Sequence, residues 1–169
     1  TKFIITSNLN VSNISKINNI EITRKNLENI DLLYQNEEVK IKNIFDVKIS
    51  KNSKSNIELL IHGSNKNFHY LGYLWQKNTL ITDSDIGSYA GAKMKDGKLI
   101  IGGSVKDYLG SEMEGGLIEV MGNAGDYLAS TLEGSRIGMR GGNVLVNGNV
   151  GKFSCFLMRR GLVIIKGNV

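Results

Sequence analysis

Apolar and aromatic residues recur at a fixed spacing in the second half of the chain. Tyr70, Tyr89, Tyr108 and Tyr127 are each 19 residues apart, and Phe153 follows after 26, which indicates an insertion of seven residues. Other positions repeat at the same spacing. Because a column that stays apolar or small recurs in successive units, the pattern indicates units that stack and bury each other's faces.

Three further columns follow this period. Nine residues before each aromatic position, or the place where the next one would fall, stands an aliphatic residue: Ile61, Leu80, Leu99, Ile118, Val144 and Val163. Five residues after the aromatic position we expect a second inward column: Trp75, Met94, Met113, Leu132 and Met158. Two residues after it the side chains are small: Gly72, Gly91, Gly110, Ala129 and Cys155. The first two columns predict core positions, and the third predicts close packing between units.

The repeating unit is too short to contain a helix. Runs such as 98–102 and 143–147 are rich in β-branched residues and bounded by glycine, which is typical of short strands. A period of 19 residues is shorter than a propeller blade and fits a parallel β-helix, whose chain rises about 4.8 Å per turn. We therefore predict an all-β, single-stranded parallel β-helix over residues 57–169. Glycines at its corners are expected to supply positive φ: Gly103, Gly122, Gly148 and Gly167.

Residues 1–56 have a different composition. All 20 glycines of the chain lie at or after Gly63, whereas residues 1–62 are rich in Asn, Lys and Ile. We expect an irregular N-terminal segment with short strands and one helix, capped by Thr23 and carrying Leu33 on its apolar face. This segment is expected to cover the first coil.

Composition excludes several classes of protein. One cysteine among 169 residues rules out an internal disulfide framework and a thiolate zinc ribbon. No apolar run approaches the roughly 18 residues of a membrane span, so we expect a cytoplasmic protein. The net charge of +5 comes from basic residues dispersed among acids, which favours solubility rather than a nucleic-acid partner. The absence of proline is consistent with a fully paired strand ladder.

Three glycine-rich stretches carry a family resemblance: Gly-Asn-Ala-Gly-Asp at 122–126, Gly-Met-Arg-Gly-Gly at 138–142, and Met-Arg-Arg-Gly-Leu-Val-Ile-Ile at 158–165. They resemble the C-subunit family of formylmethanofuran dehydrogenase, and more closely its relative in the bacterial formyltransferase/hydrolase complex of methylotrophs. The resemblance covers residues 78–169 well and the first 60 loosely. The same coil also resembles the C-terminal domain of the large glutamate synthase subunit.

The resemblance implies a right-handed β-helical subunit without a catalytic centre or bound cofactor. Its partners are then an amidohydrolase-like hydrolase and a formyltransferase, which convert formyl-tetrahydromethanopterin to formate through a formyl-methanofuran-type carrier in one-carbon metabolism. In the archaeal enzymes a molybdenum or tungsten pterin lies in another subunit. Family members continue for several more coils, so the resemblance implies a chain truncated at its C-terminus. The alternatives are a glutamate synthase-like structural domain of an amidotransferase and, third, a free β-helical enzyme.

Few residues suggest chemistry of their own. His62 and His69, the two histidines, have no evident catalytic or metal-binding partners, and Cys155 falls in the small-residue column. Asp107 and Asp126 stand one coil apart and are the nearest approach to a paired-carboxylate site. A lysine in the next coil would neutralise such a pair more simply. We therefore predict no catalytic, metal or cofactor-binding residue in this chain.

Two surfaces are the best candidates for contacts. The first is an arginine group that consists of Arg136, Arg140, Arg159 and Arg160. Guanidinium groups bind carboxylates and phosphates. In the setting of the family that the chain resembles, the ligand would be an acidic partner surface or a polyglutamate-tailed carrier. The residues that follow the inward aliphatic column should point outward and form an apolar stripe, broken by Glu119, for a subunit interface: Ile81, Ile100, Leu145 and Ile164. The N-terminal segment is expected to cover its first coils and a partner its later ones. No aromatic residues alternate with the arginines along the sequence, which disfavours single-stranded nucleic acid.

Overall fold

The computed structural model describes residues 31–34, 37–40, 49–50, 58–64 and 66–169. Its strands are β1 (Asp31–Tyr34), β2 (Glu37–Lys40), β3 (Ile49–Ser50), β4 (Glu58–Ile61), β5 (Thr79–Thr82), β6 (Lys98–Ile101), β7 (Leu117–Val120), β8 (Asn143–Val146) and β9 (Leu162–Ile165). The described residues contain no helix. They form a two-stranded antiparallel hairpin, β1–β2, and a seven-stranded sheet in the order β3 to β9.

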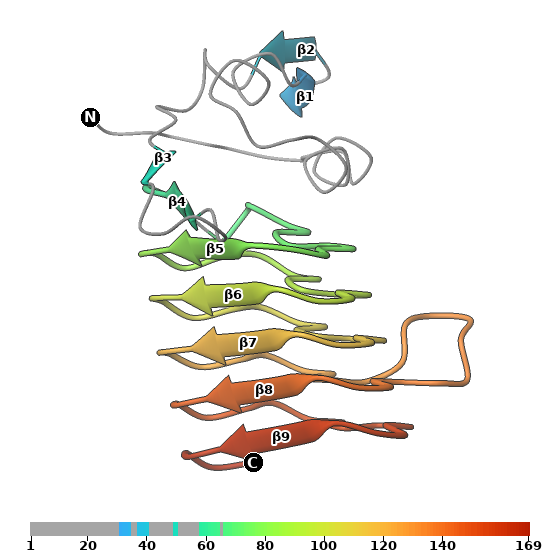
Figure 1. Ribbon diagram of the computed structural model, residues 1–169. Helices are drawn as coiled ribbons and strands as arrows, with labels where there is room; N and C mark the ends of the chain where they lie inside the picture. Colours follow the sequence, from blue (N-terminus) through green and yellow to red (C-terminus); the bar gives the residue numbers. More distant parts are fainter. Residues whose placement is uncertain (1–30, 35–36, 41–48, 51–57, 65) are drawn as a thin grey trace.

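The six strands β4 to β9 pair in parallel and in register, one coil above the next (Figure 1). Leu80 pairs with Leu99, Leu99 with Ile118, and Ile118 with Val144. Because side chains alternate across a strand, these residues face inward and are almost completely buried, while their neighbours face outward. The predicted parallel β-helix with 19-residue coils is confirmed.

A second side of each coil is held by single bridges rather than strands. Ile86, Val105, Ala124 and Val150 form a parallel row of isolated β-bridges, and all four are buried. Together with the inward residues of the strands they belong to one continuous hydrophobic core. The core therefore runs along the axis of the solenoid, and each coil stabilises the next by burying its apolar side chains.

The position of the seven-residue insertion differs from our expectation. Met139, not Leu132, continues the column of Trp75, Met94 and Met113. Met139 is fully buried, and its carbonyl accepts the N–H of Arg159 as the Met113 carbonyl accepts that of Arg140. Leu132 is only partly buried. The extra residues therefore leave the coil before the core position and form a loop over residues 132–138, which projects from the side of the solenoid (orange in Figure 1).

The prediction that the corner glycines supply positive φ was wrong. Gly103, Gly122, Gly148 and Gly167 are not among the residues with positive φ. A side chain at Gly148 would instead place its Cβ 2.3 Å from the Asn123 side chain and 2.6 Å from a backbone oxygen of the preceding coil. These glycines are needed because successive coils approach closely. Positive φ occurs elsewhere, including at non-glycine residues such as Tyr89 and Lys93.

Most of the N-terminal expectations fall outside the described residues. Thr23 and the predicted domain boundary between residues 56 and 57 are among the residues left undescribed. Leu33, which we expected on a helix, lies in β1 and pairs with Glu38 of β2. Next to the solenoid, β3 pairs antiparallel with β4, so Ile49–Ser50 adds a short strand to the first edge of the sheet.

Candidate functional site

The tyrosine column forms a continuous stack of rings on one side of the solenoid. The centroid distances are 4.7 Å for Tyr70–Tyr89, 4.8 Å for Tyr89–Tyr108, 4.9 Å for Tyr108–Tyr127 and 5.1 Å for Tyr127–Phe153. All five residues have positive φ, between 56° and 65°. An unfavourable backbone conformation that recurs in every coil must be stabilised by its surroundings, and the stacking and the inter-coil hydrogen bonds supply that stabilisation.

At three of the five aromatic positions, the side chain of the preceding residue bonds to the backbone of the next coil. Asp107 Oδ1 accepts the N–H of Asp126 at 2.9 Å, and Asp126 Oδ1 accepts the N–H of Lys152 at 2.8 Å. His69 Nδ1 accepts the N–H of Ser88 at 2.9 Å in the same way. Each of the two aspartates thus links its coil to the next through one carboxylate oxygen. Lys152 contacts Asp126 through its backbone N–H, and its side chain forms no ion pair with either aspartate among the described residues.

A second polar column runs parallel to the first, four residues before each aromatic position. Asp85 accepts the N–H of Ser104 at 2.7 Å, and Asn123 accepts the N–H of Asn149 at 2.8 Å. Ser104 and Asn149 make equivalent bonds to Asn123 and Asn168. Both columns use side chains to satisfy backbone N–H groups that have no strand partner at the corners. The arrangement explains these polar residues structurally.

Histidine and cysteine chemistry is also limited by local contacts. Burial, and then the nearby charge of Lys106, lowers the pKa of His69, which fits its role as a neutral acceptor. His62 Nδ1 lies 2.6 Å from Asp83 Oδ2, and this bond, with a second from Ser84, holds the pKa of Asp83 below its ordinary value. Burial raises the pKa of the Cys155 thiol, which disfavours the nucleophilic thiolate.

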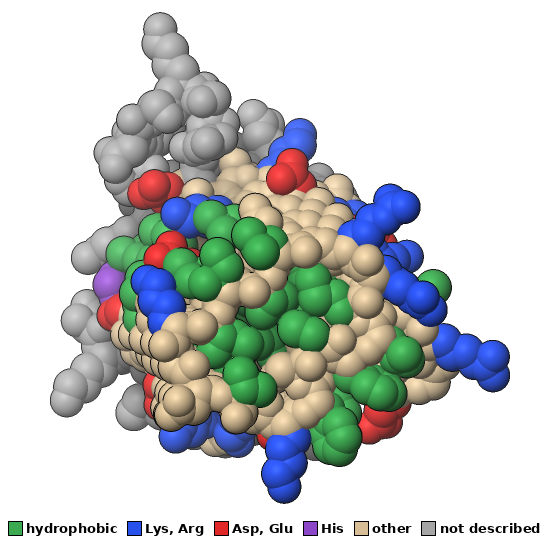
Figure 2. All heavy atoms as spheres, turned by 90° about the horizontal axis from the view of Figure 1, so that it is seen from below, with side chains coloured by type: hydrophobic (Ala, Val, Ile, Leu, Met, Phe, Trp, Pro, Cys, Tyr) green, Lys and Arg blue, Asp and Glu red, His purple; other side chains and the backbone are tan. Residues whose placement is uncertain are grey.

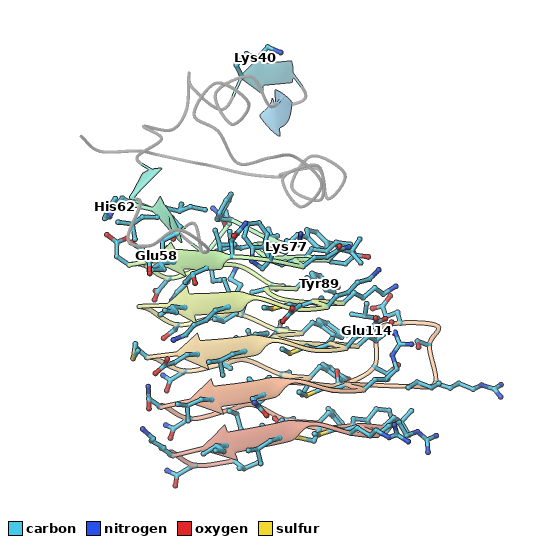
Figure 3. All side chains as sticks on the ribbon, viewed as in Figure 1. Lys40, Glu58, His62, Lys77, Tyr89 and Glu114 are labelled. Carbon is cyan, nitrogen blue, oxygen red and sulfur yellow. The ribbon has the colours of Figure 1, made fainter. Side chains whose placement is uncertain are left out.

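No group of His, Cys, Asp and Glu side chains suited to a metal ion occurs in the described part of the chain. Figure 3 shows that His62 lies on one side of the solenoid and that Tyr89 and Glu114 lie on the other. The residues that the structure describes include no helix long and apolar enough to cross a bilayer.

The outward apolar stripe lies on the face of the parallel sheet. Ile81 and Ile100 are adjacent, and Leu145 is adjacent to Ile164. The first three are partly exposed and Ile164 is 46% exposed. Glu119 interrupts the stripe, and its carboxylate lies 3.9 Å from Lys98 Nζ on the neighbouring strand. The sheet therefore presents a flat surface of mixed aliphatic and charged side chains.

The four arginines do not form one equivalent group. Arg140 donates a hydrogen bond of 2.7 Å to Glu114 across adjacent coils, so its charge is already paired. Arg136 lies exposed on the loop, and Arg159 and Arg160 lie exposed on the last coil. Unlike Arg140, these three make no ion pair with any residue that the structure describes.

The loop over residues 132–138 is tied to the coils on both sides. Leu132 N–H donates to the carboxylate of Glu112 in the coil before, at 3.2 Å. In the coil after, Phe156 and Leu157 accept bonds from Thr131 and Gly138 at the two ends of the loop. Glu112 is buried and lies 3.6 Å from Lys93 Nζ. Sequence spacing does not indicate this anchor, because it depends on where the insertion leaves the coil.

Seen along the axis from the β9 end, the solenoid exposes hydrophobic side chains surrounded by basic ones (Figure 2). The exposed fraction is 58% for Phe153 and 52% for Leu162. Met158 and Val163 are partly buried against the core.

Comparison with known proteins shows which fold this is. No protein-family model and no curated protein matches the sequence. The fold does have a solved counterpart: the structure superposes, with a TM-score of 0.81, on a chain of the formyltransferase/hydrolase complex of Methylorubrum extorquens, determined in complex with methylofuran. The two sequences are 18% identical, and the match covers 98% of this chain. This chain spans 61% of the length of that one. The two proteins therefore share the solenoid fold.

Proposed function

We propose that this chain is a non-catalytic structural subunit of a cytoplasmic formyltransferase/hydrolase complex in one-carbon metabolism. Within it, formyl-tetrahydromethanopterin would be converted to formate through a formyl-methanofuran-type carrier. The single observation that carries the proposal is the superposition with a chain of such a complex over 98% of this sequence. The glycine-rich stretches at 122–126, 138–142 and 158–165 point the same way.

The use of the polar residues supports a structural rather than a catalytic role. Asp107, Asp126 and His69 each accept a backbone N–H from the next coil, so these groups are committed to holding the solenoid together. A nucleophile needs an adjacent base, and the described residues place none beside Cys155, the thiol whose pKa burial raises. We therefore assign the transfer and hydrolysis steps to partner subunits of the formyltransferase and amidohydrolase-like classes.

In our proposal the carrier, like the catalytic steps, is handled by the partner subunits. The related complex was solved with methylofuran, and in our proposal a carrier of that type is bound and moved between the catalytic subunits. This chain contributes surfaces rather than a cofactor site. Of these, the outward stripe of Ile81, Ile100, Leu145 and Ile164 is proposed as an interface with another subunit, because aliphatic side chains on a flat sheet favour burial.

The test is to identify the stable partners of the protein. We expect a tagged copy, purified from its native cells and examined by native mass spectrometry, to be recovered with a formyltransferase and a hydrolase in a fixed ratio. Recovery with the glutaminase and synthase parts of an amidotransferase would replace the proposal with the glutamate synthase-like alternative. Recovery as a protein without partners would contradict both.

A further inference from the structure

Met121 differs in character from the other residues of its column. The column lies at the corner six residues before each aromatic position, or the place where the next one would fall: Asp83, Gly102, Met121, Asn147 and Lys166. Four of the five are charged, polar or glycine, whereas Met121 carries a large apolar thioether. Such a local departure from the pattern of a fold is expected at a functional site.

The Met121 side chain is exposed in the middle of the solenoid, with an exposed fraction of 46%. The coils of β8 and β9 follow it and supply Asn147 and Lys166 to the same column, so this exposure does not depend on the last coil. Among the described residues before 150, the other exposed large apolar side chain is that of Ile137, which lies on the inserted loop. Met121 is therefore the exposed large apolar residue of the regular coils up to that point.

Three other methionines lie in the core of the solenoid. Met94, Met113 and Met139 each have an exposed fraction of 0%, and Met158 is partly buried against the core. Oxidation of a thioether requires that the oxidant reach the sulfur, so susceptibility follows exposure. The described residues therefore include one accessible thioether and three inaccessible ones of the same chemical type.

The Met121 sulfur has a hydrogen-bond donor beside it. Asn147 Nδ2, in the next coil, donates to Met121 Sδ at 3.2 Å. The backbone on both sides of this contact is fixed, because Met121 N–H donates to the carbonyl of Ile101 and Asn147 N–H to that of Val120, each at 2.9 Å. A thioether sulfur is a weak acceptor, whereas a sulfoxide is polar and carries an oxygen that accepts more strongly. The same amide is therefore placed to bind the oxidised side chain.

The neighbour of Met121 in the preceding coil is a glycine. Gly102 is exposed and carries no side chain. Equivalent residues of successive coils lie about 4.8 Å apart, so a long side chain at position 102 would cover Met121 from that direction. With glycine there, position 102 does not hinder a small oxidant, while the amide of Asn147 occupies the direction of the next coil.

We propose that Met121 is a site of reversible oxidation by peroxides. A lone pair of the sulfur attacks one oxygen of hydrogen peroxide, and the S–O bond forms as the O–O bond breaks. The transferred oxygen gives its proton to the departing hydroxide, so the products are methionine sulfoxide and water. Sulfur loses two electrons and the peroxide gains them. A sulfoxide reductase with a dithiol reverses the change, because the dithiol is oxidised to a disulfide and the sulfoxide oxygen leaves as water.

Oxidation at this position changes the surface of the solenoid and spares its core. The side chain becomes polar at a corner where the equivalent residues are already polar, charged or glycine. At Met113 the same oxygen would be inserted into an apolar environment without a partner, which destabilises a fold. The site goes beyond the proposed function and does not depend on it.

The experiment uses the tagged protein as purified from its native cells, with any partners that it retains. Hydrogen peroxide is added, and peptide mass spectrometry of timed samples measures the gain of one oxygen at each methionine. We expect Met121 to be oxidised at least about tenfold faster than Met94, Met113 and Met139. The matched control Met121→Leu should remove this fast reaction and leave the three slow ones unchanged. Equal rates at Met121 and at the core methionines overturn the proposal.

Reversal and the role of Asn147 are measured on the same preparations. Sulfoxide reductases for both sulfur epimers, supplied with dithiothreitol, should return most of the oxidised Met121 to the thioether, and a sulfoxide that resists both overturns reversibility. Hydrogen exchange of the peptide around residue 121 should be the same before and after oxidation in the wild type. In Asn147→Ala, which lacks the donor amide, oxidation should make that exchange several times faster. An equal response in the two proteins overturns the role assigned to Asn147.

Discussion

The carboxylate of Asp107 accepts a hydrogen bond of 2.9 Å from the backbone N–H of Asp126, its own equivalent in the next coil. At this corner a side-chain oxygen satisfies the backbone N–H of the next coil, as backbone carbonyls do between the paired strands β6 and β7. It predicts that the acceptor oxygen matters and the negative charge does not.

Replacing Asp107 by alanine and by asparagine separates these two roles. The change Asp107→Ala leaves a backbone N–H without its partner, and we expect it to lower the free energy of unfolding by about 1–2 kcal/mol. The change Asp107→Asn keeps an acceptor oxygen and should retain most of that stability. Urea unfolding of both variants measures the difference. Equal losses in the two variants would indicate that charge compensation, not the hydrogen bond, is the role of Asp107.

Gly125 occupies the space that the Asp107 side chain needs. A Cβ at Gly125 would lie 2.3 Å from Asp107 Oδ1, so Gly125→Ala should displace the carboxylate and cost about 1–3 kcal/mol through overpacking. One coil earlier, Lys106 is equivalent to Gly125, and Ser88, which has a shorter side chain, is equivalent to Asp107. The matched control Lys106→Ala should therefore change stability by less than about 0.5 kcal/mol. Thermal unfolding of the pair checks this, and similar melting temperatures would contradict it.

The position of the insertion can be tested with two core substitutions. Met139 is fully buried, so Met139→Ala should cost about 2–5 kcal/mol by leaving a cavity. Leu132 is partly buried at the base of the loop, and Leu132→Ala should cost much less. Denaturant unfolding gives both values. If Leu132→Ala proved the more damaging, the insertion would have to follow residue 132 instead.

The buried carboxylate of Glu112 anchors the loop through the N–H of Leu132. Glu112→Ala removes that acceptor, and we expect trypsin to cleave after Arg136 several times faster than in the wild type. Glu112→Gln keeps an acceptor and should protect the loop almost as well. Mass spectrometry of timed digests reports cleavage at this bond specifically. Equal rates for alanine and wild type would show that the loop does not depend on Glu112.

The tyrosine stack predicts a dependence of stability on alkaline pH. Burial, followed by the charges of neighbouring groups, raises the pKa of Tyr89 and Tyr108 above its ordinary value. The folded state therefore retains these protons when the unfolded state has lost them, so stability should be intact below the unfolded pKa of about 10 and fall as pH rises through the folded values.

Tyr89→Phe and Tyr108→Phe test the assignment. Both keep the ring stack and remove the titrating hydroxyl. The double variant should therefore lose less stability than the wild type between about pH 9 and 11, which is about one unit either side of the ordinary tyrosine pKa. In an ultraviolet titration, tyrosine ionisation should extend to higher pH in the wild type than in the double variant. An unchanged pH profile in the double variant would rule these residues out as the cause.

The repeat could be predicted from the sequence because most inward positions of the strands carry apolar side chains. Leu80, Leu99, Ile118 and Val144 are equivalent in the printed sequence and pair in the structure. The position of the insertion could not, because both Leu132 and Met139 are apolar and spacing alone does not distinguish them. The structure distinguishes them because the carbonyl of Met113 accepts the backbone N–H of Arg140, so the chain has returned to the coil at Met139.

The roles of the glycines and the aspartates are hidden from the sequence for a different reason. They depend on contacts between residues of successive coils, such as Asn123 against Gly148. The pairing of Arg140 with Glu114 across 26 residues likewise depends on the coil register after the insertion. Positive φ at tyrosine is a poor expectation from sequence, since L-residues disfavour that conformation and only the fold enforces it.

In our proposal this chain supports formyl transfer without performing it. The most direct measurement compares formate production from formyl-tetrahydromethanopterin, with a methylofuran-type carrier present, by the isolated chain and by the complex purified through its tag. We predict activity in the complex, none in the isolated chain, and unchanged activity per assembled complex when Asp107 and Asp126 are both replaced by asparagine. Formate production by the isolated chain, abolished by those two substitutions, would contradict the account.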